Sequence, residues 1–468
     1  MHANRTIMKS LFTPKKIALA SMVSIQLFGA AAHAADLIDV WKSALERDPA
    51  YISSKYEQLA ADKHREQGTA LWLPNVNLSA TTASMTNNST TTGAQFYAPG
   101  MGTFNGANFN TSINNGFGNQ YALSIVQPIY NKEKLSQSRQ LKMSADAADL
   151  GWSNAQQNLI LLVAERYFDV LSAEESLRLV GNEQSAIQDM RNEIARRVKL
   201  GNATQTDLEE ANQNLDSIKL QTLNLKNDLE LKRLSLNDLL SSSENIKKLS
   251  VSLNFSQLKL DPLSTYVEKL KSQNIQLKMM SVQESIAKEE VAKYSIDSSP
   301  TLNAIAQSSR NILTGTGDFG AASNANTNNM IGLQLNIPLY TGGYRNSKQE
   351  ELILLLEKIR SDVNQTTLSL EKTLRNLWYS LQSSKDRLAI LKNSQKSSQD
   401  RLEQTKKSYD VGSRTSLELL AAQNELIQNQ HSLYQEQVNN LLNRLRLASL
   451  VGELSEQDLK LVNSYLKQ

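Results

Sequence analysis

The chain holds few side chains that could perform chemistry. Its 468 residues contain no cysteine and four histidines, at positions 2, 33, 64 and 431. Scattered imidazoles predict neither a metal centre nor a nucleophilic triad, and without cysteine there is no thiolate zinc site, thiol nucleophile or disulfide. Its glycine-rich segments also lack the Lys-Ser/Thr of a phosphate-binding loop. The sequence therefore predicts no enzyme, no metal and no cofactor.

Two acidic residues recur at one spacing after a glycine. Asp207 follows Gly201, Glu418 follows Gly412, and a threonine stands three residues before each acid. Thr-x-x-acid is the spacing of a capping box, in which the two side chains bind backbone N–H groups at a helix start. Glycine just before it is typical of a helix end. The pattern predicts two helix-turn-helix corners.

The elements that carry these corners are long helices. Between Tyr344 and Val411 there is no glycine or proline, and 68 helical residues at about 1.5 Å rise span roughly 100 Å. A spacing of four and three residues predicts a coiled-coil seam on this helix, and a spacing of seven predicts the packing face of its neighbour. The seam comprises Leu370, Leu374, Leu377, Leu381, Ser384, Leu388 and Leu391, and the neighbouring face comprises Leu420, Ile427, Tyr434, Leu441 and Ala448.

Two windows differ from this helical composition. Residues 67–131 contain no Asp, Glu, Lys or Arg, and residues 298–344 contain only Arg310 and Asp318, although 21% of the chain is charged. Alternating apolar residues within the windows predict strands near 74–84, 119–130, 300–310 and 328–339, with polar glycine-rich loops between them. A soluble sandwich with one wet face would show the same alternation. The missing charge favours a wall in lipid, which a strand crosses in about 9–11 residues.

Four strands cannot close a barrel. An open edge in lipid leaves backbone groups unpaired, so closure must come from other copies of the chain. Three copies would give twelve strands, an acceptable even number, although this argument alone does not select three.

The N-terminus has the pattern of a secretory signal. Lys15 and Lys16 precede an apolar run that ends in Ala32-His33-Ala34, which predicts a signal peptide over residues 1–34 and a mature start near Ala35. A membrane anchor or a surface helix fits less well, because the run is short and ends in small residues. Without the four basic residues of this segment the formal charge of +3 becomes −1, which excludes a nucleic-acid partner.

The two halves of the chain match each other. Gln127-Pro-Ile-Tyr130 corresponds to Ile337-Pro-Leu-Tyr340, and Leu200-Gly201 to Val411-Gly412. This internal symmetry predicts a first repeat at 35–240, a linker at 241–262, a second repeat at 263–452 and a tail at 453–468.

Several segments resemble one known family. Residues 409–423, Tyr-Asp-Val-Gly-Ser-Arg-Thr-Ser-Leu-Glu-Leu-Leu-Ala-Ala-Gln, are similar to the YxVGxRTxxDVLxA signature of the TolC outer-membrane efflux family. Residues 44–50, 338–343 and 450–459 resemble it too, so the likeness covers nearly the whole mature chain.

The resemblance implies an α+β membrane protein that works as a homotrimer. Its twelve-stranded β-barrel would be continuous with an α-helical coiled-coil tunnel in the periplasm, and residues 241–262 with the tail would form an equatorial strap. The function implied is an exit duct in the outer membrane of a Gram-negative bacterium, serving a tripartite efflux pump or a type I secretion system. Implied partners are outer-membrane lipid, a periplasmic adaptor and an inner-membrane pump of the RND, ABC or MFS type.

The resemblance also implies a gate at the helix corners. Tyr409 and Arg414 would be latch residues, with Thr206 and Asp207 as their partners in the first repeat. Glu418 falls on an acidic ring at the entrance, but the second acid of that ring is replaced by Ala421. Capping of helices competes with gating for Asp207 and Glu418.

Three other hypotheses remain open. A structural coiled-coil tether would explain the helices but not two uncharged alternating hairpins, and a porin would need strands over most of the chain. The aromatic residues of the first glycine-rich loop favour either loop anchoring or a receptor surface. The transported substrate is not encoded in any recognisable motif.

Overall fold

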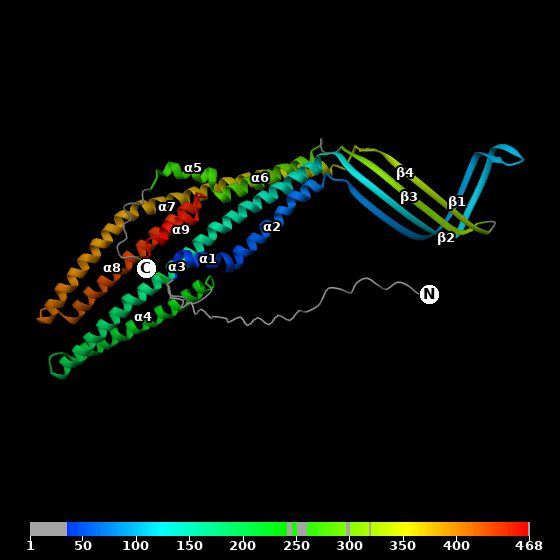
Figure 1. The fold of residues 1–468 in the computed structure, drawn as a ribbon. Helices are drawn as coiled ribbons and strands as arrows, with labels where there is room; N and C mark the ends of the chain where they lie inside the picture. Colours follow the sequence, from blue (N-terminus) through cyan, green and yellow to red (C-terminus); the bar gives the residue numbers. More distant parts are fainter. Residues whose placement is uncertain (1–34, 241–245, 250–259, 296–299, 318–319, 467–468) are drawn as a thin grey trace, which may run out of the picture.

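The computed structural model describes residues 35–240, 246–249, 260–295, 300–317 and 320–466. The molecule is elongated, with a helical body at one end and a β-sheet at the other (Figure 1). The predicted signal peptide and most of the predicted linker lie outside the described residues. Within them, no helix combines the length and the apolar character needed to cross a membrane.

The same order of elements occurs twice. In the first half, helix α2 (Pro49–Ala70) leads to strands β1 (Asn75–Ala98) and β2 (Gly102–Asn131), followed by helices α3 (Lys132–Lys199) and α4 (Gln205–Asn237). In the second half, α6 (Ile275–Tyr294) leads to β3 (Thr301–Gly317), β4 (Gly320–Asn336), α7 (Tyr344–Asp410) and α8 (Ser416–Leu450). The described part of the body also contains three shorter helices: α1 (Leu37–Arg47), α5 (Leu263–Gln273) and α9 (Glu456–Asn463). The boundaries proposed for the two repeats stay predictions.

The four strands form one antiparallel sheet in the order β1-β2-β3-β4. The expectation of four strands joined to long helices is therefore confirmed. The expected polar loops are wrong in both halves. β1 and β2 continue to a turn at residues 99–101, and β3 extends to Gly317 while β4 begins at Gly320. β4 ends at Asn336 instead of near 339, just before Pro338, which has no N–H to donate to a ladder.

The register separates the sheet into an apolar and a polar face near the helices. Leu78 pairs with Leu123 and Ala306 with Ile331, so large apolar side chains share one face. Ile331 is 89% exposed, and most of its large neighbours are exposed too. The apolar face carries Val76, Leu78, Tyr121, Leu123, Ile125, Leu302, Ala304, Ala306, Ile331, Leu333 and Leu335. The polar face carries Asn77, Ser79, Gln120, Ser124, Asn303, Gln307, Ser309, Gln334 and Asn336.

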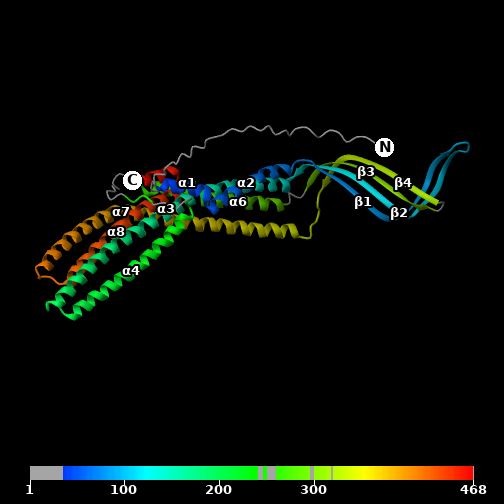
Figure 2. The ribbon, with the colours of Figure 1, turned by 60° about the horizontal axis from the view of Figure 1, so that its bottom comes forward.

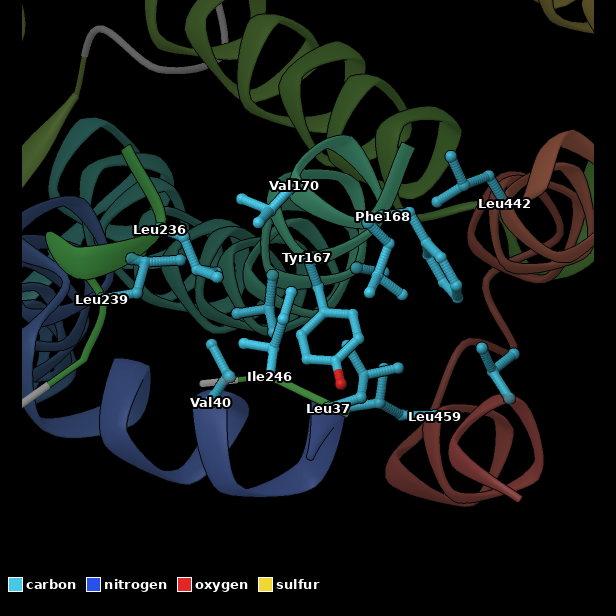
Figure 3. Packing of buried hydrophobic residues seen from close by; sticks show 14 of the residues in the cluster. Leu37, Val40, Tyr167, Phe168, Val170, Leu236, Leu239, Ile246, Leu442 and Leu459 are labelled. Atoms are coloured by element: carbon cyan, nitrogen blue, oxygen red, sulfur yellow. The ribbon is translucent and has the colours of Figure 1, made fainter. Parts of the chain in front are cut away.

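The main hydrophobic core lies midway along the body, where the long helices meet short segments from distant parts of the chain (Figure 3). Tyr167 on α3 is fully buried there, and its hydroxyl donates to the carbonyl of Lys247 at 2.8 Å. Ala35 bridges Ile246, and Leu249 bridges Leu466. The segment at 246–249 thus connects Ala35 with Leu466 beside α3.

The residues of the predicted seam on α7 are buried or half-buried, but the predicted partner face is wrong. Leu374 and Leu381 pack in a cluster with Leu447 of α8 and Leu270 of α5. Leu441 belongs instead to the core around α3. The spacing of seven correctly identified an apolar stripe on α8. However, α8 buries two faces, and this stripe packs against the first half of the chain instead of against α7.

Candidate functional site

The two helical hairpins, α3–α4 and α7–α8, turn at the end of the body farthest from the sheet (Figures 1 and 2). We call these turns the helix corners: residues 200–204 in the first hairpin and 411–415 in the second. Every residue that the sequence singled out as a site candidate lies at or beside a corner. The corners are therefore the candidate functional site within the helical body.

The two corners share one backbone geometry. Gly201 and Gly412 adopt φ of 80° and 78°, in the left-handed region that favours glycine. In the second corner the N–H of Ser413 donates to the carbonyl of Ser408 at 2.9 Å, and the first corner makes the matching bond at 2.8 Å. This is the Schellman ending, which satisfies the last carbonyls of α3 and α7 and reverses the chain. α3 and α7 end at Lys199 and Asp410, beside these glycines.

Each following helix begins with a capping box. The carboxylate of Asp207 accepts the N–H of Thr204 at 2.8 Å, and the Thr204 hydroxyl accepts the N–H of Asp207 at 3.2 Å. Thr415 and Glu418 make the same pair of bonds at 2.9 and 3.2 Å. These bonds, led by the threonine N–H, hold the pKa of both carboxyl groups below their usual range. The capping interpretation of the two acids is confirmed.

Arg414 turns toward its own helix. Its guanidinium pairs with Glu418 one turn later, and this contact adds to the lowering of the Glu418 pKa. Thr206 is exposed. Among the described residues, no hydrogen bond or ion pair joins Tyr409 or Arg414 to Thr206 or Asp207. The structure thus brings the latch candidates to adjacent corners without joining them inside one copy.

Tyr409 contacts a residue that the sequence did not single out. Its side chain is buried, and the guanidinium carbon of Arg197 lies 5.0 Å from the ring centroid. Arg197 also donates to Glu193 at 3.1 Å, and this bond within α3 fixes the position of the guanidinium. Its sequence signal was only that of a basic residue in the last turn of α3, which favours interaction with the helix dipole. The contact connects α3 to α7 next to the corners.

The sheet provides a second part of the site. β1 and β4 each pair with one neighbour, so the sheet has two open edges, 24 and 17 residues long. An exposed apolar face of this size marks contact with lipid or protein. The row of Tyr121, Arg310 and Thr327 ends the apolar band on the side away from the helices.

The described residues contain no group of His, Asp or Glu arranged to hold a metal ion. Two histidines instead make single contacts between helices. His64 lies 3.3 Å from the Ser144 hydroxyl, and His431 lies 3.1 Å from that of Ser176. These imidazoles serve helix packing.

Comparison with known proteins matches the chain over almost its whole length. Residues 40–242 and 266–453 fit the protein family described as outer membrane efflux protein. The outer membrane protein TolC of Vibrio cholerae is 25% identical over 465 residues, which covers 97% of this chain and 99% of that protein. The alkaline protease secretion protein AprF of Pseudomonas aeruginosa is 23% identical over 441 residues, covering 92% and 87%.

Solved structures show the same fold. The CmeC outer membrane channel of Campylobacter jejuni superposes with a TM-score of 0.69 at 15% identity, covering 98% of each chain. The outer membrane protein VceC of Vibrio cholerae gives a TM-score of 0.68 at 15% identity, covering 89% of this chain and 96% of that one.

Proposed function

Because this chain belongs to the outer membrane efflux protein family, we propose that three copies of it close one channel through the outer membrane and its periplasmic tunnel. The chain is an outer-membrane exit duct for efflux and type I secretion, with a large periplasmic portion. The proposal adds the trimer, the gate and the partners.

The proposed trimer is supported by one observation. Among the described strands, the sheet has an exposed apolar face and two unpaired edges, β1 and β4. β1 runs away from the helices and β4 returns toward them. β1 of one copy and β4 of the next are therefore antiparallel, as the other pairs in the sheet are. Joining edge to edge satisfies the backbone groups that lipid cannot satisfy. Three copies give twelve strands with the apolar face outward and the polar face on the lumen.

The long helices supply the tunnel. α3 has 68 residues and α7 has 67, and at about 1.5 Å rise per residue each spans roughly 100 Å. Such helices reach far beyond a bilayer, so they enclose a passage across the periplasm. The conduit is continuous because α3 follows β2 with no intervening residue.

We place the gate at the helix corners. Arg414 is 54% exposed and uses one of its five donors on Glu418, which leaves donors for a neighbouring copy. Asp207 and Thr206 are exposed on the adjacent corner. Tyr409 connects α7 to α3 within each copy through its contact with Arg197. Three copies of Glu418 near the axis give the entrance a negative potential, weaker than that of a double acidic ring, because Ala421 supplies no charge.

The partners follow from what the chain lacks. We propose no catalysis and no cofactor in this chain, so the energy comes from an inner-membrane pump of the RND, ABC or MFS type through a periplasmic adaptor. The relatives include an outer membrane protein TolC and a protease secretion protein, which supports both efflux and protein export. A structural tether would need neither the sheet nor its apolar face.

The proposed function is tested by measuring single-channel conductance. The purified protein in a planar lipid bilayer is expected to give discrete channels of low conductance. Arg414→Ser is expected to raise that conductance, because it removes the cation that joins neighbouring corners. Arg401→Ser is the matched control, since Arg401 is a similarly exposed arginine of α7 that pairs with Glu425 away from the corner. Absence of channels from an assembled oligomer would refute the proposed function.

A further inference from the structure

The first β-hairpin is longer than the sheet to which it belongs. The outermost pair between β2 and β3 joins Asn114 to Thr316, whereas β1 and β2 continue from the pair Asn87–Ile113 to the pair Ala98–Gly102. We call residues 87–113 the arm. It is a two-stranded ribbon that bends away from the other strands (Figures 1 and 2). It carries no charged side chain.

The bend is built into the base of the arm. Register breaks occur between Met85 and Asn87 in β1 and opposite them in β2. Asn115 adopts a positive φ of 50° there, a conformation uncommon outside glycine. A β-bulge of this kind bends a strand and redirects the residues beyond it. The direction of the arm is thus a fixed feature of the backbone.

Glycines show toward which face the arm bends. A Cβ on Gly315 would lie 2.8 Å from the carbonyl oxygen of Asn114 and 2.7 Å from a methyl carbon of Ile113. A Cβ on Gly116 would lie 2.9 Å from a methyl carbon of Leu313. The chain at the base of the arm therefore crosses directly over β3, in space that side chains would fill.

That face is the polar one. Gly315 stands an even number of residues from Leu313 and Ser309 in β3, so all three face the same side as Gln307 and the other polar residues. Leu313 and Ser309 are 8% exposed and Ile113 is 6% exposed, whereas Gln120, Gln307 and Gln334 on the same face are exposed. In a barrel whose apolar face meets lipid, the polar face lines the lumen. The arm leans over the channel exit.

The arm presents unpartnered surface. Phe96 stacks on Phe104 with ring centroids 5.0 Å apart and meets Phe109 edge-on at 5.2 Å, yet all three rings remain more than a third exposed. Tyr97 and Met101 at the tip are 70% and 75% exposed. A lone two-stranded ribbon is marginally stable in water, and its two edges are unpaired. The arm needs a partner.

The size of the exit identifies that partner. Twelve strands about 4.8 Å apart, tilted by about 40°, give a barrel radius of about 12 Å. The β1 part of the arm, Asn87 to Ala98, is about 40 Å long at about 3.3 Å per residue. Arms that lean inward from three copies are therefore long enough to reach one another at the axis. An uncharged, aromatic ribbon is also suited to an identical ribbon and poorly suited to anionic lipid headgroups.

We propose that the three arms pack against one another over the channel exit and form an outer constriction, at the end opposite the helix corners. This inference rests on the proposed trimer. The occupant of each exposed tip is the tip of a second copy of this chain.

Single cysteines test the proposal cleanly, because the chain has none of its own. Tyr97→Cys and Met101→Cys are each purified in detergent, oxidised, and run on a denaturing gel without reductant. One cysteine per copy in a threefold assembly allows one disulfide, so about two thirds of the chains are expected in a band of twice the monomer mass. Ser323→Cys, on the exposed and shorter hairpin of β3 and β4, is the matched control and is expected to stay monomeric on the gel.

Native mass spectrometry of the same samples distinguishes failure of the arm contact from failure of the proposed trimer. Trimers that crosslink through Tyr97→Cys or Met101→Cys, but not through Ser323→Cys, support the arm contact. Trimers in which the tip thiols react with maleimide yet do not crosslink would overturn it and leave the proposed function standing. Absence of trimers would overturn both. In a bilayer, reduction of the crosslinked channel that also carries Arg414→Ser, which removes the limit set by the helix corners, is expected to raise its conductance, and an unchanged conductance would refute the constriction.

Discussion

At the scale of single residues, Tyr409 joins the two helical hairpins through its ring. Its contact with Arg197 is a cation–π interaction, which is worth about 0.5–1 kcal/mol at a partly exposed site. In the proposed trimer this small energy would be contributed three times. The ring face makes the contact, and the structure gives the hydroxyl no role in it.

This assigns different outcomes to two substitutions. Tyr409→Phe keeps the ring and is expected to leave single-channel conductance unchanged, whereas Tyr409→Leu removes the ring and is expected to raise it. Arg197→Leu should resemble Tyr409→Leu, since either change removes the pair. The measurement is conductance of each trimer in a planar bilayer. A raised conductance for Tyr409→Phe would show that the hydroxyl is the latch.

The capping acids make the corners sensitive to low pH. The pKa values of Asp207 and Glu418 are lowered from 3.8 and 4.5, first by the threonine N–H groups. The unfolded chain therefore takes up these protons at higher pH than the folded corner does. The stabilisation is complete above about pH 4.5 and is lost as the pH falls through the lowered values in the folded state.

The expected result is local fraying in acid. Amide hydrogen exchange of the peptides at 204–210 and 415–421, corrected for intrinsic rates, should show constant protection from pH 7 to pH 5 and reduced protection at pH 3. Asp207→Asn should lack the pH-dependent part at the first corner alone, with the second corner as the internal control. Equal loss of protection along all of α4 would contradict a corner-specific effect.

At the scale of elements, the α7–α8 interface contains a polar layer within its apolar seam. Ser384 and Asn440 are buried, and their side chains hydrogen-bond at 2.8 Å. Ser384 also donates to Glu436 at 2.6 Å, and Arg387 donates to the same carboxylate at 2.8 Å. A buried polar layer in a coiled-coil seam fixes the register of the two helices.

Removing either charge should therefore weaken the hairpin. Arg387→Ala and Glu436→Ala are each expected to cost about 1–3 kcal/mol, because each leaves a partly buried polar group short of a partner. The double variant should lose less than the sum of the two, as expected for residues in one network. Thermal unfolding followed by circular dichroism measures all three, and simple additivity would show that the pair does not interact.

The two faces of the sheet predict opposite tolerance of charge at adjacent positions. Leu333 lies on the apolar face and Gln334 on the polar face of β4. Leu333→Arg is expected to cost about 2–4 kcal/mol if its side chain meets the middle of the bilayer, and Gln334→Arg little. Urea titration of the protein refolded into lipid vesicles measures both. Equal cost at the two positions would refute the assignment of faces.

Some features of these elements could be predicted from the sequence and others could not. Alternation located the strands, and Gly412 with the Thr-Glu spacing located a corner, because both are local patterns that the backbone imposes. The arm was expected to be a loop because it is rich in Asn and Gly, two residue types that are depleted in strands. The two segments of the arm have similar composition, and their pairing with each other stabilises both as strands. The contact of Arg197 with Tyr409 was missed because it joins residues more than 200 positions apart, on helices whose mutual packing no local pattern records.

At the scale of the whole molecule, the proposed trimer depends on the free edges of β1 and β4. Successive N–H groups of a strand point to opposite sides, so of two adjacent residues in β4 one faces β3 and the other faces the open edge. Asn328 and Asn329 are exposed neighbours of identical type within β4. Replacing one of them with proline removes an N–H from the ladder inside the chain, and replacing the other removes one from the edge.

Asn328→Pro and Asn329→Pro should therefore separate folding from assembly. The variant that alters the edge is expected to keep its secondary structure in circular dichroism and to appear largely as monomers in native mass spectrometry. The variant that alters the β3–β4 ladder is expected to lose stability within each chain. Since the helices alone do not seal the membrane wall, the proposed trimer requires edge pairing. If both variants stay fully trimeric, the copies are held together by their helical bodies, and closure of the barrel follows assembly instead of driving it.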